Sequence, residues 1–101
     1  MSDLKRFMIR LPNGEPSEVE GIEVQIPCLP GWRFFARDHK GFWCVTEVRS
    51  GGVFPPSTRL ETMEESVAKV EKFCLKQGPE ECIRVFMKVI DKFGDLPTFA
   101  Q

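Results

Sequence analysis

The sequence predicts an α+β fold: an antiparallel sheet of four strands, with a candidate fifth, followed by two C-terminal helices packed on one face. Two observations lead to this class. Between residues 4 and 54 apolar and polar residues alternate, whereas from residue 62 onward apolar residues recur at helical spacing. Strands that precede helices across short connections favour an antiparallel sheet covered on one side. The length of 101 residues suits a single domain, 1–101, with one core.

Four segments are predicted to be strands. Residues 4–11 and 22–26 alternate apolar and polar side chains, and 22–26 shows the clearest alternation in the chain. Residues 32–37 and 42–48 are expected to form a hairpin around the turn Asp38-His39-Lys40-Gly41. Residues 53–54 are the candidate fifth strand. It must be short, because the two prolines that follow have no backbone N–H for a ladder.

The helical half is predicted to begin at Thr62. Thr62 and Glu65 have the spacing of a capping box, in which the hydroxyl accepts from the N–H of Glu65 and the carboxylate reaches back to the N–H of Thr62. Gly78 suits the end of the first helix, and Pro79 the first turn of a second that runs to about Phe93. The two apolar stripes comprise Met63, Val67, Val70, Phe73 and Cys74, then Cys82, Ile83, Phe86, Met87, Val89, Ile90 and Phe93.

The segment from Gly31 to Phe54 holds both tryptophans, four of the nine phenylalanines and the only histidine. Placing Arg37 opposite Phe42 separates the hairpin into two faces. One face is apolar and is expected to pack against the helices. The predicted shared core comprises Ile22, Val24, Ile26, Trp32, Phe34, Trp43, Val45, Val67, Val70, Phe86 and Ile90.

The other hairpin face interleaves arginines with aromatics and is the predicted partner-binding surface: Arg33, Phe35, Arg37 and Phe42. Three interpretations stay open. The arginines can simply cover the aromatic rings by cation–π contact. The face can be the centre of an interface with a protein or with a second copy of the chain, where aromatics and arginine are enriched. It can also stack unpaired bases of single-stranded nucleic acid and hold phosphates.

Charge favours a protein partner or a homodimer over nucleic acid. The net charge is −1, so no global electrostatic attraction to phosphate is expected. Residues 12–30 carry a net charge of −4, and residues 31–59 one of +3. The broad stripe of the last helix, together with Leu96 and Phe99, predicts either a second contact surface or a tail that folds back on the core.

No catalytic, cofactor or metal site is predicted. His39 is expected at an exposed turn, without the partner that orients a general base. The four cysteines, at positions 28, 44, 74 and 82, lack the close pairs of zinc sites. The N-terminus has no apolar signal segment, and no apolar run approaches the ~18 residues of a membrane span. We therefore expect a non-catalytic cytoplasmic interaction domain with reduced thiols.

The run from Trp43 to Gly52, followed by Thr62 and a helix, resembles a strand–turn–helix pattern of many short proteins of bacteria and their mobile elements. This resemblance implies no particular function.

Overall fold

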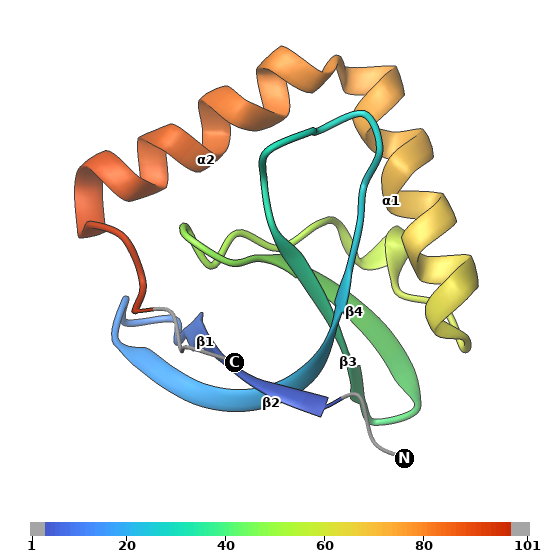
Figure 1. Ribbon diagram of the computed structural model, residues 1–101, viewed down its shortest axis with the longest axis horizontal. Coiled ribbons are helices and arrows are strands. Elements are labelled where there is room, and N and C mark those ends of the chain that lie inside the picture. Colours follow the sequence, from blue (N-terminus) through green and yellow to red (C-terminus); the bar gives the residue numbers. More distant parts are fainter. Residues whose placement is uncertain (1–3, 98–101) are drawn as a thin grey trace.

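The computed structural model describes residues 4–97 and has four antiparallel strands followed by two helices (Figure 1). The sheet order is β1-β2-β3-β4, and the α+β prediction is confirmed. Val53 forms a single bridge to Thr46, so the candidate fifth strand is reduced to one residue pair. The elements are β1 (Leu4–Arg10), β2 (Pro16–Val24), β3 (Phe34–His39), β4 (Phe42–Glu47), the 3₁₀ turn η1 (Pro56–Thr58), α1 (Met63–Gln77) and α2 (Pro79–Phe93).

The predicted hairpin register, with Arg37 opposite Phe42, is wrong by two residues. The connection is the two-residue turn Lys40-Gly41, with φ of 56° and 87°, rather than a turn of four residues. Strand β3 therefore continues to His39, which pairs with Phe42. Left-handed backbone at both turn positions matches the twist of the flanking strands. Because the shift is an even number of residues, every hairpin residue keeps its predicted face.

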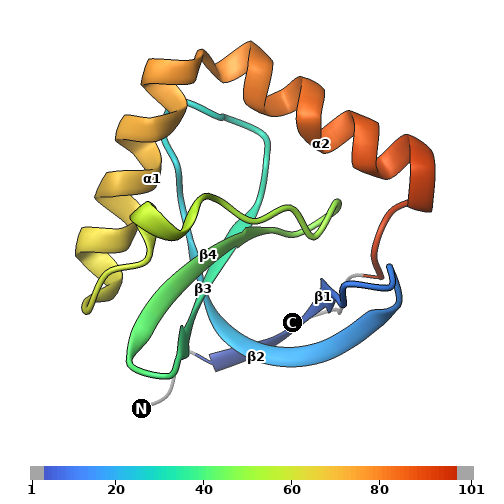
Figure 2. The ribbon, with the colours of Figure 1, turned by 180° about the vertical axis from the view of Figure 1, so that it is seen from behind.

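The helices begin and end where the sequence predicts. The hydroxyl of Thr62 accepts from the N–H of Glu65 at 3.2 Å, and Gly78, at φ 97°, ends α1. The predicted capping box differs in one bond, since the Glu65 carboxylate accepts from the Thr62 hydroxyl at 2.8 Å. The helices form an arch over one face of the sheet, with α1 against β3 and β4 (Figures 1 and 2).

The main core lies between this face and the helices. The ring of Phe86 lies within 5.4 to 6.1 Å, between ring centroids, of Trp32, Phe34 and Phe54. Of the predicted core, Ile22 and Ile90 lie outside this cluster. Its buried members are Ile26, Leu29, Phe34, Ala36, Val45, Phe54, Val70, Cys74, Cys82 and Phe86, with Val24, Trp32, Trp43 and Val67 among those packed against them.

A second, smaller core lies on the opposite face of the sheet. The rings of Phe7 and Phe35 stack with centroids 4.3 Å apart and planes 2° from parallel, and Val48 packs beside them. Strand β2, which lies between β1 and β3, curves strongly (Figure 1). A Cβ at Gly21 would lie 2.7 Å from the Phe35 ring and 2.8 Å from the carbonyl oxygen of Ala36. The missing side chain at Gly21 therefore lets the two rings meet across β2.

The turn after β4 is organised by a fully buried carboxylate. Glu47 accepts from the backbone N–H groups of Arg49 and Ser50, each at 2.7 Å. Its own backbone N–H donates to the carbonyl of Gly52 at 2.9 Å. Buried charge is tolerated in proteins when it is hydrogen-bonded in this way. The turn sends the chain back along the outer edge of β4.

The C-terminal tail folds back onto this turn, one of the two outcomes that the sequence left open. Leu96 is buried, and its N–H donates to the carbonyl of Arg49 at 2.8 Å. The Arg49 side chain pairs with Asp95 at 2.6 Å. The prediction for Phe99 lies outside the described residues.

We expect Gly21→Ala to destabilise the fold by about 1–3 kcal/mol, because the new methyl group would overlap the Phe35 ring. Denaturant unfolding measures the effect. Ser17→Ala, on the same strand and face, is the matched control. If both variants unfold at the same denaturant concentration, the stacking across β2 does not depend on the glycine.

We expect Glu47→Gln to cost about 1–3 kcal/mol of unfolding free energy, because one carboxamide oxygen replaces two acceptors and leaves a buried N–H unpaired. The exposed Glu20→Gln on β2 is the control, and it should change stability little. Equal unfolding midpoints for the two variants in urea would contradict the role given to Glu47.

Candidate functional site

The four predicted partner-binding residues do not form one exposed surface. Phe35 is fully buried against Phe7, so the predicted aromatic platform is corrected at this position. Arg33 makes a two-pronged ion pair with Glu23 (2.8 and 3.0 Å), which lowers the pKa of that carboxyl. Arg37 is half-buried, and its Nε has no hydrogen-bond partner. Phe42, with 48% of its surface exposed, is the predicted aromatic that stays accessible.

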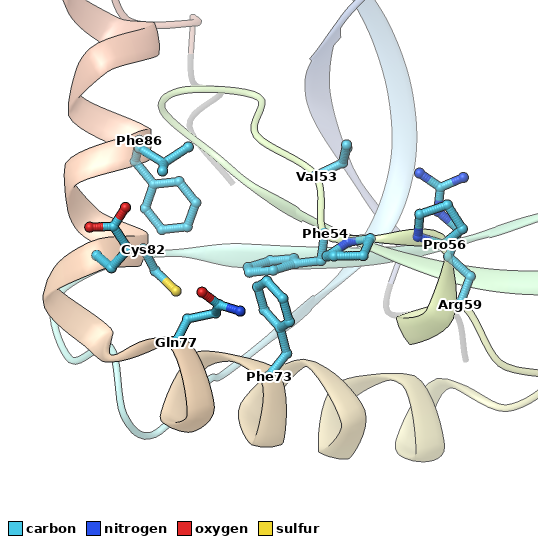
Figure 3. A pocket seen from close by; sticks show the side chains of 11 residues that line it. Val53, Phe54, Pro56, Arg59, Phe73, Gln77, Cys82 and Phe86 are labelled. Atoms are coloured by element: carbon cyan, nitrogen blue, oxygen red, sulfur yellow. The ribbon is translucent and has the colours of Figure 1, made fainter.

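A recess of about 480 Å³ lies between the segment after β4 and the two helices (Figure 3). Phe54, Phe73 and Phe86 line it, with the Phe54 ring 6.1 Å from each of the others and nearly perpendicular to both. Val53 and Val85 also line it, and they are 60% and 47% exposed. This helix-side recess has the size and apolar lining typical of binding pockets.

A second recess, of about 460 Å³, lies beside the end of the β3–β4 hairpin. It is lined by His39, Lys40, Phe42 and Cys44, and His39 is exposed as predicted. Two residues, Pro56 and Arg59, line both recesses, so the recesses are adjacent. We call this one the hairpin-side recess, and the two together the β4-edge groove.

Hydrogen bonds hold the segment that forms the middle of the groove. The N–H and hydroxyl of Thr58 donate to the carbonyl of Pro55 at 2.9 and 2.7 Å. The carbonyl of Leu60 accepts from the N–H of Trp43 at 2.8 Å, and the N–H of Leu60 donates to the Ser66 hydroxyl at 2.8 Å. The segment is thus tied to β4 and to α1, and the groove wall is pre-organised.

The charge at the middle of the groove is positive. Arg59 is half-buried, and within residues 4–97 no carboxylate forms an ion pair with it. Lys40 adds a second cation at the hairpin-side recess. The acidic residue of the helix-side recess, Glu81, is paired with Arg84, at 2.9 Å between Oε2 and Nε. Arg59 therefore has its charge available to a bound group.

Three of the four cysteines gather in the main core, where Cys74 and Cys82 are buried as predicted. Burial and the neighbouring Glu71 carboxylate raise the pKa of the Cys28 thiol to about 11. Burial also raises the pKa of Cys74. Protonated thiols are poor nucleophiles and poor metal ligands. Among the described residues, no three His, Cys, Asp or Glu side chains are placed to hold a metal ion.

Sequence reasoning missed most of the groove. Val85 lies on α2 outside the predicted apolar stripe, among Glu81, Arg84 and Lys88. An apolar residue on a charged helix face is the signal that could have identified it. The sequence predicts Val53 as part of a candidate strand, but the two prolines that follow it prevent further pairing, and its side chain is exposed.

No protein-family model, curated protein or solved structure matches the chain. Within the part of the chain that the structure describes, no helix is both long and apolar enough to cross a membrane. The geometry and chemistry of the β4-edge groove are therefore the basis for a functional proposal.

We expect the Cys28 thiol to react with iodoacetamide at pH 8 on the order of a hundredfold more slowly than free cysteine, because little thiolate exists three units below its pKa. The rate should rise as the pH approaches 11. Glu71→Gln should accelerate the reaction by removing a negative charge beside the thiol, whereas Glu64→Gln should not. Mass spectrometry of the native protein follows the modification, and a Cys28 as reactive as glutathione would contradict this.

Proposed function

We propose that this chain is a non-catalytic interaction module that binds a protein partner through the β4-edge groove. One observation carries the proposal. Three exposed apolar residues from separate parts of the chain, Phe42, Val53 and Val85, line adjacent recesses along one hydrogen-bonded wall. Of the hairpin residues first predicted to bind a partner, Phe42 is the one that belongs to this groove.

The energetics support such a role. When a partner removes exposed apolar side chains from water, binding is favoured by about 25 cal/mol per Å² of apolar surface buried. Interface hot spots are typically aromatic or apolar anchors in such pockets. The segment from Val53 to Leu60 is already hydrogen-bonded to β4 and α1. Binding a partner therefore costs this segment little further conformational entropy.

Two other functions lead to different observations. Self-association would also cover exposed apolar residues, and would make the molecular mass depend on concentration. Single-stranded nucleic acid could stack on Phe42 beside Lys40 and Arg59. The apolar lining of the helix-side recess and a net charge of −1 give phosphate less to bind, so a protein partner is the stronger proposal.

The test is selection of a phage-displayed library of random peptides on the immobilised chain. Enriched peptides should bind wild type at least about tenfold more tightly than the double variant Val53→Ser with Val85→Ser, a difference of ~1.4 kcal/mol. The matched control is Leu75→Ser with Met87→Ser, which removes two exposed apolar residues that line neither recess.

Circular dichroism and thermal unfolding check that all variants stay folded, as expected for substitutions at exposed positions. Absence of enrichment, or equal binding to the groove variant and to wild type, would refute the proposal. A mass that rises with concentration in light scattering, lost in the groove variant, would replace it with self-association. Oligonucleotide binding with a steep salt dependence would replace it with the nucleic-acid function.

A further inference from the structure

We infer that the groove accepts an extended peptide segment in which a carboxylate lies between two apolar side chains. This inference rests on the proposed function and specifies its partner. Each apolar side chain would enter one recess, and the carboxylate would bind the guanidinium of Arg59. The partner is thus an acidic–apolar linear segment of another protein.

The guanidinium of Arg59 is suited to bind the carboxylate. Its backbone position is held where η1 ends, because its N–H donates to the carbonyl of Pro56 at 3.0 Å. Three other arginines pair with carboxylates: Arg33 with Glu23, Arg49 with Asp95 and Arg84 with Glu81. Arg59 is half-buried beside apolar side chains and has no such carboxylate within residues 4–97. A guanidinium in this setting favours two-pronged binding of a carboxylate.

Arg59 lies where the two recesses meet. Arg59 and Pro56 are the residues common to both linings. Recesses of about 480 and 460 Å³ each have room for an apolar side chain. A ligand that fills both must pass Pro56 and Arg59. An extended peptide does this while presenting side chains at successive positions.

The charges that line the groove favour an acidic ligand. Lys40 lines the hairpin-side recess, and Arg37 lies directly opposite Cys44, another lining residue. The Nε of Arg37 is buried without a hydrogen-bond partner. Glu81, the acidic residue of the lining, pairs with Arg84. Among the residues that line the two recesses, the charges without an ion-pair partner in the described part of the chain are those of Arg59 and Lys40, so the lining complements an acidic segment and opposes a basic one.

The test starts from the peptides enriched on the wild-type chain. We expect their shared pattern to contain Asp or Glu between two apolar residues. One such peptide is synthesised with its acid intact and with the matching amide, Glu→Gln or Asp→Asn. Fluorescence anisotropy measures both peptides against wild type, Arg59→Gln, Arg59→Lys and the control Lys72→Gln, which removes an exposed α1 charge away from the groove.

The acidic peptide should bind wild type and Lys72→Gln about tenfold more tightly than the amide peptide. This preference should vanish for Arg59→Gln and be partly retained by Arg59→Lys, which keeps the charge but loses the planar fork. Arg59→Gln should still bind the amide peptide about as tightly as wild type does, whereas a poorly folded variant would lose both peptides.

The outcomes separate the two proposals. Groove-dependent peptides without an acidic residue, or an acid preference that Arg59→Gln leaves unchanged, would overturn the inference and leave the proposed function standing. Peptides that bind equally to the variant with Val53→Ser and Val85→Ser would refute both. Displacement of the acidic peptide by single-stranded DNA, with a steep salt dependence, would assign Arg59 to phosphate and overturn the inference.

Discussion

The turn after β4, and the C-terminal tail that contacts this turn, both depend on the buried carboxylate of Glu47. By accepting from the N–H groups of Arg49 and Ser50, it sets the turn that ends β4. The chain leaves this turn along the β4 edge and forms the groove wall. The same turn receives the tail, through the carbonyl of Arg49 and the N–H of Leu96. The hydrogen bonds of one buried side chain therefore hold the turn that the groove wall follows and that the tail contacts.

The outer edge of β4 is an edge of the sheet and also contributes to the candidate binding surface. An edge strand exposes unpaired backbone groups that attract other strands. Here Trp43 and Glu47 donate to the carbonyls of Leu60 and Gly52, so the following segment covers part of this edge. The prolines of that segment cannot extend it into a full strand. Apolar side chains beside them remain accessible, so this part of the edge exposes side chains in place of backbone groups.

Local patterns predicted the fold well, and contacts between distant segments explain what they missed. The helix caps at Thr62 and Gly78, together with the hydrophobic periodicity of each segment, were enough to predict the type and order of the elements. These signals act over only a few residues. The burial of Phe35 depends on Phe7 reaching across β2 at Gly21. No pattern within the hairpin contains that information. Likewise, the groove joins residues from β4 to α2, and of the predicted site Phe42 alone lines it.

The contact between the first strand and the end of the last helix bears on biosynthesis. The guanidinium of Arg10 donates to the carbonyls of Ser50 and Gly94 and lies over the ring of Phe93. Since α2 supplies one wall of the helix-side recess and follows the sheet in the chain, this wall is added after the strands have been synthesised. A nascent chain can form the hairpins early, because their pairs are local in sequence. The helix-side recess also needs α2, so it is complete only once α2, which follows the sheet in the chain, has packed against the earlier segments.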